Sequence, residues 1–374
     1  MRLSSRELFM ICPRRLIAAI AIVVLTPALA HAIPRYSARY QQKCALCHMN
    51  PSGGGMRNLY ASQYLVPEEI AWAKPKNDVL SKIDPEITKG VTIGTDFRLF
   101  HRYSNDNQPP TNFFQMQGDI YLAFQMDDNL SLYYDQGMSS KYELFGMWQG
   151  LPLTGYVKAG RFVPSYGWRF DDHTMFVRED LGFFPPANSD VGIEFGISPG
   201  RSDIQLAVLN GNRGSTYDND KKLAACLSGV YRFHLADVGV ALGGAGYWQD
   251  GDASNYGTGG FFGSLTWWRL VWLGELDYTL EERSGDDHTT GLVTSHEVSY
   301  LCRQGLELLA TYDFFDGNYS VKSGAMSRWG GGVSVMPRPS LVLEALYRKT
   351  IYDDGAEFAG DDSWETLLQF HLLY

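Results

Sequence analysis

The chain has 374 residues, of which 45% are hydrophobic and 14% aromatic, and 32 Lys and Arg against 42 Asp and Glu give it a formal charge of −10. This acidic balance argues against nucleic acid as a partner, because phosphate backbones require basic surfaces. The length suffices for two ordinary domains or for one large β structure.

Residues 1–32 have the layout of a cleaved secretory signal peptide. Four arginines precede the apolar run LIAAIAIVVL at 16–25, and Ala30-His31-Ala32 supplies a small-x-small cleavage site. The apolar run is too short to be a membrane-spanning helix. Removing the signal takes away four arginines and Glu7, which leaves 28 basic against 41 acidic residues and a formal charge of −13.

Residues 33–86 are predicted to form a small N-terminal module around Cys44-Ala45-Leu46-Cys47-His48. The pattern C-x-x-C-H is the attachment site of a c-type haem. The thiols of Cys44 and Cys47 would add to the two vinyl groups, and His48 would be the proximal ligand of the iron. The motif follows the predicted cleavage site by twelve residues, which places it in the periplasm, where such haem is attached. A covalent haem c would supply much of the core that so short a module lacks.

Two other interpretations of the motif stay open: a zinc site, and a disulfide or redox dithiol between Cys44 and Cys47. Zinc would need a fourth ligand and would set Cys47 and His48 side by side, unlike its usual ligand pairs. The remaining mature cysteines, Cys226 and Cys302, stand singly in strand-like segments. They are predicted to pack as small hydrophobic residues, with a disulfide as the alternative.

The distal haem ligand is predicted to be Met56, because Gly53-Gly54-Gly55 could let the chain turn back over the ring. The identity of this ligand would shift the reduction potential. His101 is expected on the outer face of a strand, and His234 in a periplasmic turn. His173 lies in a long loop and would reach the haem only if that loop entered the lumen.

From about Val91 to the last residue the apolar side chains recur with period two, which predicts half-buried strands. Phe114, Met116, Ile120 and Leu122 alternate with polar residues, and so do Leu306, Leu308, Ala310 and Tyr312. Seven short breaks alternate with eight longer polar ones, which predicts sixteen antiparallel strands with both ends on the short-turn side. This asymmetry is typical of outer-membrane barrels, which combine short periplasmic turns with long extracellular loops. A barrel of this size leaves an aqueous lumen.

The sequence therefore predicts an all-β fold, with a transmembrane antiparallel barrel over 87–374. The final strand carries apolar residues on one face and ends in Tyr374, which resembles the C-terminal assembly signal of outer-membrane proteins. The longest loop, 164–188, follows the fifth strand and resembles the constriction loop of sixteen-stranded porins. A soluble β-sandwich or propeller is the alternative fold.

The signal peptide, the single N-terminal motif of Cys44, Cys47 and His48, and the barrel pattern together resemble the fused monohaem cytochrome–porins of bacterial outer membranes, known best from ferrous-iron oxidisers. The resemblance implies one covalent haem c held in, or at the mouth of, an outer-membrane barrel. It implies as partners membrane lipid, a periplasmic c-type cytochrome and an extracellular redox partner such as ferrous iron. The segment from Met49 to Gly55 departs from the pattern of the iron oxidisers. This difference weakens the case for ferrous iron as the electron donor more than it weakens the predicted architecture.

The leading hypothesis for function is an electron conduit across the outer membrane. A diffusion porin with a plugging or sensing haem module is the alternative, and a soluble periplasmic β-rich redox protein is the second alternative. The sequence contains no nucleophile motif and no phosphate-binding glycine loop, which favours an electron-transfer protein over an enzyme. Ferrous-iron oxidation is the one enzymatic activity that stays open.

Overall fold

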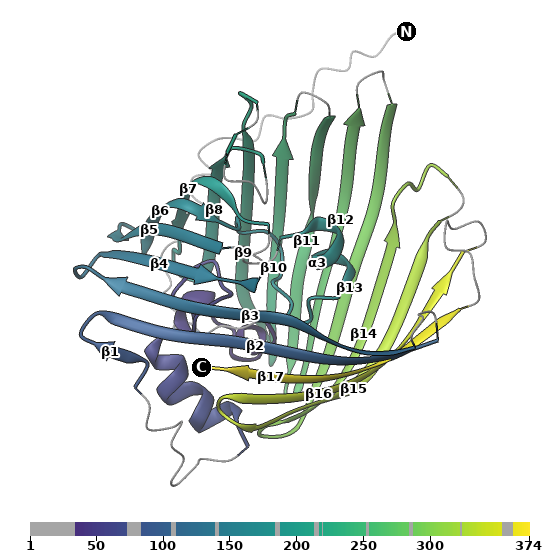
Figure 1. Cartoon of the computed structure of the whole chain (residues 1–374), viewed down its shortest axis with the longest axis horizontal. Coiled ribbons are helices and arrows are strands. Elements are labelled where there is room, and N and C mark those ends of the chain that lie inside the picture. The colour runs from purple at the N-terminus through teal and green to yellow at the C-terminus, as the bar shows by residue number, and fades with distance from the viewer. Residues whose placement is uncertain are drawn as a thin grey trace.

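A computed structural model of the chain describes residues 34–72, 84–105, 110–138, 142–183, 188–212, 217–218, 220–251, 254–283, 287–321, 324–353 and 362–374. The predicted signal peptide, 1–32, lies outside these residues. Sixteen consecutive antiparallel strands, β2 to β17, form a closed ring in which β17 pairs with β2 (Figure 1). The short β1 (Glu86–Thr88) pairs with the start of β2. The predicted fold class, an all-β sixteen-stranded barrel, is confirmed.

The elements before the barrel are α2 (Pro34–Tyr40), a 3₁₀ turn η1 (Cys44–Leu46) and a π-helix η2 (Ala61–Ile70). The barrel strands are β2 (Val91–Ser104), β3 (Thr111–Gln125), β4 (Leu130–Gln136), β5 (Tyr142–Leu151), β6 (Gly155–Phe162), β7 (Asp190–Ile197), β8 (Ser202–Leu209), β9 (Ala224–Leu235), β10 (Val238–Gln249), β11 (Ser254–Trp267), β12 (Leu270–Arg283), β13 (Asp287–Arg303), β14 (Leu306–Asp316), β15 (Met326–Arg338), β16 (Leu341–Tyr352) and β17 (Ser363–Leu373). The helix α3 (Phe176–Leu181) interrupts the loop between β6 and β7.

The connections follow the predicted alternation of short turns and longer loops except at two places: three residues join β12 to β13 and four join β10 to β11, where the sequence predicts longer loops. Only two residues join β9 to β10 and β11 to β12, and Ala236 and Trp268 in these turns adopt left-handed φ values of 52°. Two-residue hairpin turns require positive φ because their twist must match that of the strands. Since neighbouring strands are antiparallel, the predicted short turns all lie at one end of the barrel and the remaining connections at the other.

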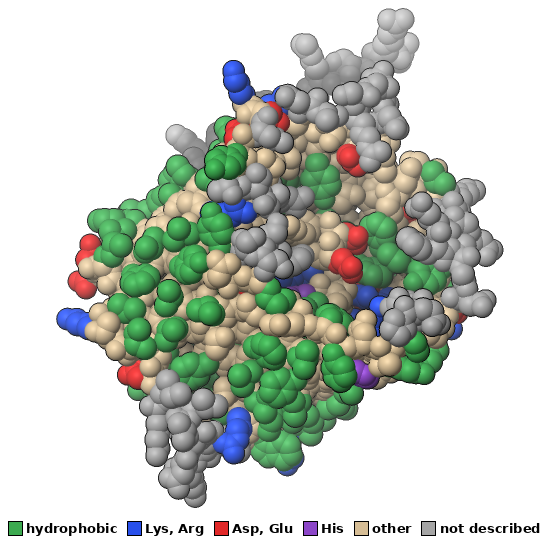
Figure 2. Space-filling model, viewed as in Figure 1, with side chains coloured by type: hydrophobic (Ala, Val, Ile, Leu, Met, Phe, Trp, Pro, Cys, Tyr) green, Lys and Arg blue, Asp and Glu red, His purple; other side chains and the backbone are tan. Residues whose placement is uncertain are grey.

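The wall of the barrel is polar inside and apolar outside. Side chains such as Asp119, Glu194 and Asp277 point inward and are buried, whereas Phe261, Phe195 and Leu242 point outward and are exposed. Figure 2 shows hydrophobic side chains spread over the outer face of the strands nearest the viewer. This reverses the arrangement of a water-soluble protein, and it is the pattern expected where the outside faces lipid.

One part of the predicted strand pattern is wrong. The alternation predicts Phe114 and Met116 on the same face as Ile120, which is exposed, but they pack against a buried cluster that contains Phe100. A bulge is the reason: the register shifts between Arg98 and Leu99 of β2, which pair with Gln117 and Gln115 of β3. A single extra residue in one strand turns all the side chains beyond it to the other face.

Residues 34–72 lie at the short-turn end of the barrel and reach into it; Figure 1 shows the N-terminal helices there. Thr266 Oγ1 of β11 donates to Ala38 O at 2.8 Å, and Tyr133 Oη of β4 accepts from Met56 N at 3.1 Å. Trp72 N donates to Met336 O of β15 at 2.8 Å. The segment therefore touches strands on several sides of the lumen. None of the helices in the described part of the chain combines the length and apolar character needed to cross a membrane.

The long loop between β6 and β7 folds into the lumen, as its resemblance to a constriction loop predicts. Tyr166 Oη donates to Asp277 Oδ1 of β12 at 2.6 Å. Phe176 N, at the start of α3, donates to Asp313 Oδ1 of β14 at 3.2 Å. The loop meets the N-terminal segment directly, because Arg169 Nη1 donates to Gly53 O at 2.5 Å.

Candidate functional site

The C-x-x-C-H motif forms a compact turn inside the barrel. Cys47 N and His48 N both donate to Cys44 O at 3.1 Å, which draws the three residues together. Both cysteines are free thiols; Cys44 is partly exposed and Cys47 is buried. Burial raises the pKa of the Cys44 thiol. The tight spacing presents two thiols and an imidazole from one turn of the chain.

The imidazole of His48 is held through Nδ1, which lies 3.3 Å from Gly55 O. If Nδ1 carries the proton and donates it to this carbonyl, Nε2 keeps its lone pair for a metal, which is the usual arrangement of a ligating histidine. Burial, and then the nearby charge of Arg57, lower the pKa of His48 to about 4. The ring is therefore neutral at neutral pH, as metal ligation requires.

Three consecutive glycines make this arrangement possible. Gly53, Gly54 and Gly55 all have positive φ, at 86°, 75° and 64°, where other residues are strained. A Cβ at Gly53 would lie 3.1 Å from Cys44 Sγ, and one at Gly55 would collide with the Tyr133 hydroxyl. The glycine run thus keeps the space beside the Cys44 thiol open and brings the Gly55 carbonyl to His48.

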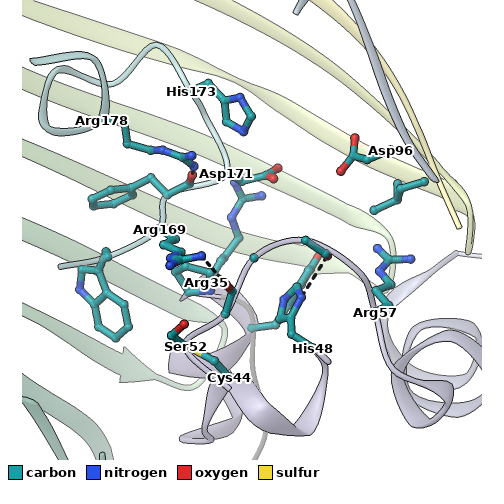
Figure 3. A pocket seen from close by; sticks show the side chains of 18 of the residues that line it. Arg35, Cys44, His48, Ser52, Arg57, Asp96, Arg169, Asp171, His173 and Arg178 are labelled. Atoms are coloured by element: carbon teal, nitrogen blue, oxygen red, sulfur yellow. Dashed lines mark hydrogen bonds between the residues drawn. The ribbon is translucent and has the colours of Figure 1, made fainter. Parts of the chain in front are cut away.

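A cavity opens beside the motif, between the N-terminal segment, the long loop and the wall (Figure 3). Cys44 and His48 line it from below in this view, and His173 lies across it, on the loop. Asp96 of β2 and His371 of β17 line it from the wall. The strands bring these residues together because β17 closes the ring against β2.

Two arginines at the cavity have only backbone oxygens as hydrogen-bond partners. Arg57 Nη1 donates to Pro339 O at 3.0 Å, and Arg169 donates to Gly53 O and Val163 O. Within the described ranges neither guanidinium forms a salt bridge with a carboxylate, unlike Arg35, which is paired with Glu297. Two guanidinium groups that form no salt bridge suit a ligand that carries carboxylates, because charge-assisted pairs with arginine are strong. The two propionates of a haem are such carboxylates, so the residues present fit the predicted group.

The structure brings together only part of the predicted site. Cys44 and His48 line the cavity, whereas Cys47 packs beside it in an apolar cluster with Ala61 and Leu65. Met56 is 1% exposed, lies in a different apolar cluster with Tyr121 and does not line the cavity. The reason is local pairing. His48 and Arg57 face each other in an antiparallel bridge, so the next residue, Met56, points to the opposite side. Its role as the distal ligand stays a prediction.

The other histidines considered for that role are spread over the barrel. His101 lies on the outer face, where its ring contacts Phe113. His234 is exposed near the end of β9. His173 does enter the lumen, because the loop that carries it does. Burial and the charges of Arg178 and Arg98 lower its pKa, so it too is neutral.

Sequence reasoning missed His371, Arg57 and Arg169. Strand alternation contained a signal for His371, since it stands opposite to the apolar face of the last strand and must point inward. No comparable signal exists for the two arginines, whose positions depend on how the loop and the segment fold. Among the described residues no group of three or more His, Cys, Asp or Glu side chains is placed to hold a metal ion. The zinc interpretation stays a prediction.

Of the other cysteines, Cys226 is a buried free thiol whose Sγ donates to Ser165 O at 3.2 Å. Cys302 is a free thiol of intermediate exposure.

No family model matches the chain, and no curated protein matches it. Solved structures do. An anion-selective porin from Comamonas acidovorans superposes with a TM-score of 0.57 at 11% identity, over 76% of this chain and 99% of that chain. OmpT of Vibrio cholerae gives 0.55 at 12% identity, over 76% and 97% of the two chains. OprB of Pseudomonas putida gives 0.56 at 8% identity, over 82% and 99%. At such identities the likeness is one of fold: the chain folds as a porin-type barrel.

Proposed function

We propose that this protein is an electron conduit of the bacterial outer membrane, in which one covalent haem c is held inside a porin-type barrel. The haem would be bonded to Cys44 and Cys47, with His48 as its proximal ligand. An extracellular donor or acceptor, with ferrous iron as one candidate donor, would exchange electrons at the loop end. A periplasmic c-type cytochrome would do so at the short-turn end. When bound, the haem iron supplies one-electron oxidation and reduction.

The observation that carries the proposal is the position of the C-x-x-C-H turn beside a cavity within the barrel. The residues around it suit a haem: two thiols that form no disulfide, an imidazole whose Nδ1 faces the Gly55 carbonyl, and two cavity arginines whose hydrogen bonds go to backbone oxygens. The apolar outer face supports insertion into a membrane. It also speaks against a soluble periplasmic protein, in which such a face would be exposed to water.

The filling of the lumen supports electron passage over solute passage. The N-terminal segment and the long loop together bury inward charges such as Lys158 and Glu194, which are 0% exposed. The apolar band of an outer-membrane barrel is about 25 Å tall. A redox group inside the lumen shortens the distance to either side, compared with one at the periplasmic mouth.

A second candidate is a diffusion porin that a haem-bearing segment plugs or senses. The comparisons by themselves favour it, since the similar structures are porins and the names given above mention no haem. The two candidates share the barrel and the haem, and they differ in what crosses the membrane.

Electron transfer in liposomes tests the proposal and separates it from the second candidate. The protein is inserted into vesicles that contain a redox dye, and an impermeant reductant is added outside. We expect the wild type to reduce the dye and the Cys44→Ala/Cys47→Ala variant to do so no faster than empty vesicles. Equal rates for the two proteins would overturn the conduit.

Bilayer conductance of the same preparations provides the control for leakage. A conduit with a filled lumen should pass little ion current in both forms. A large current in the wild type, without haem-dependent dye reduction, would instead establish the diffusion porin.

A further inference from the structure

His371 is a buried histidine of the barrel wall, on the last strand of the chain. It lies on the inner face of β17, is 2% exposed and lines the cavity beside the C-x-x-C-H turn. Its Nε2 lies beside the carboxylate of Asp96, whereas its Nδ1 has no hydrogen-bond partner. Leaving a buried polar atom without a partner destabilises a fold, so the unpartnered Nδ1 of His371 points to a ligand.

The surroundings of His371 are those of a metal-ligating histidine. Its Nε2 lies 2.8 Å from Asp96 Oδ1, the distance of an ion pair. Arg98 Nε in turn lies 3.4 Å from the same carboxylate oxygen. Ligating histidines commonly have a carboxylate at the ring nitrogen that does not bind the metal, and this carboxylate orients the ring. Nδ1 of His371 would then be the nitrogen free to bind.

The strand register sets His371 close to the haem attachment turn. Val342 of β16 is paired directly with His371 and belongs to the apolar cluster that contains Cys47. Leu373, two residues further along the same face of β17, packs against that cluster as well. Residues on strands are held more rigidly than residues on loops, which favours His371 over the loop residue His173 as a ligand.

We propose that His371 is the second protein ligand of the haem iron, with Asp96 as the positioning residue that orients its ring. This inference rests on the proposed haem and adds that the barrel itself, and not the N-terminal segment, completes the coordination. The haem would then join the segment to the wall, through Cys44, Cys47 and His48 on one side and His371 on the other.

The test is the spin state and midpoint potential of the purified ferric protein. We expect a six-coordinate, low-spin wild type. His371→Ala should keep its covalent haem but become high-spin, and added imidazole should restore the low-spin spectrum. His173→Ala and Met56→Leu are the matched controls and should stay low-spin.

Two further variants distinguish loss of the ligand from loss of folding and test the role of Asp96. His371→Met keeps a ligand in place, so it should stay low-spin with a raised potential, since methionine in place of histidine raises the potential of a c-type haem. Asp96→Asn should shift the potential without changing the spin state. Heat-modifiable migration on gels checks that each variant is a folded barrel.

The outcomes separate this inference from the proposed function. A haem-stained wild type that is high-spin, or a His371→Ala variant that stays low-spin without imidazole, would overturn His371 as ligand and leave the conduit standing. Loss of the low-spin spectrum in His173→Ala or Met56→Leu alone would give the role to that residue. A wild type without covalent haem would overturn both proposals.

Discussion

Replacing Arg35 by methionine removes the main ionic anchor between the N-terminal segment and the barrel wall. Arg35 Nε and Nη2 donate to the two carboxylate oxygens of Glu297 at 2.8 and 3.2 Å, and Nη1 donates to Glu307 at 3.0 Å. The side chains of Arg35, Glu297 and Glu307 are 10%, 4% and 4% exposed. In the variant Glu307 keeps Arg39 as a partner, whereas Glu297 loses its counter-ion.

The magnitude follows from the burial of these charges. Breaking a buried, hydrogen-bonded ion pair by removing one partner costs about 3–5 kcal/mol, because the other charge stays buried. Since about 1.4 kcal/mol corresponds to a factor of ten, the open state of the segment should become roughly 100- to 5000-fold more populated. The barrel strands keep all their backbone hydrogen bonds, so the loss concerns docking of the segment and not closure of the barrel.

Limited proteolysis of the folded, detergent-solubilised protein measures this population. A protease that cuts at apolar residues should cleave within 34–72 at a rate proportional to the open fraction, provided that the segment recloses faster than it is cut. Arg35→Met/Glu297→Gln should recover most of the protection from the protease. Removing both charges destabilises the docked segment far less than leaving one buried charge without its partner.

Lys349→Met is the matched control. Its ion pair with Asp362 spans 2.7 Å, but the two side chains are 49% and 44% exposed. Such surface pairs contribute little, about 0–1 kcal/mol. Cleavage of Arg35→Met no faster than that of Lys349→Met would refute the docked position of the segment.

Three further substitutions test other parts of the structure. Gly55→Ala should undock the glycine turn, because the added Cβ would collide with Tyr133. Gly324, which has a φ of +99° and open space around it, is the control: Gly324→Ala should show only backbone strain of roughly 1–2 kcal/mol. Thermal melting compares the two variants, and equal losses of stability would contradict the predicted collision. Lys158→Met leaves the carboxylate of Glu194, 2.9 Å from Lys158 Nζ, buried without its counter-ion. The variant should lower the free energy of unfolding by about 3–5 kcal/mol in denaturant titrations, and Lys158→Met/Glu194→Gln should recover most of this loss. If the double variant recovered no stability, the unpaired charge of Glu194 would not be the cause of the destabilisation. Leu242→Arg, on the outer face of β10, should weaken insertion into liposomes by up to about 2–4 kcal/mol, and unchanged insertion would argue that this face does not meet lipid.

The strands could be predicted from the sequence because a membrane barrel repeats one local rule. Each strand alternates, and each break is either a short turn or a loop, so the number of strands and their order along the chain follow without tertiary information. The rule fails at β3, where the bulge opposite Arg98 and Leu99 inverts Phe114. Nothing in the composition of that strand marks the bulge, because the sequence on either side still alternates.

The site could be predicted only where its residues are adjacent in the chain. Cys44, Cys47 and His48 form a local motif, but the other residues that line the cavity are distant from it in the sequence. His371 meets Asp96 because the last strand closes on the first, and Arg169 reaches Gly53 because a long loop turns inward. Met56 illustrates the same dependence on tertiary structure: its spacing predicts a distal ligand, whereas the direction of its side chain follows from the pairing of His48 with Arg57, which no local pattern marks.

Haem staining of the protein after gel electrophoresis distinguishes a haem-bearing barrel from a porin without haem. We expect a single band in the outer-membrane fraction that shifts on boiling, as a folded barrel does, and that stains for covalent haem. In the Cys44→Ala/Cys47→Ala variant the shift should remain and the stain should vanish. A wild-type band that shifts on boiling but carries no haem would contradict the account and leave a porin-type barrel with an N-terminal plug.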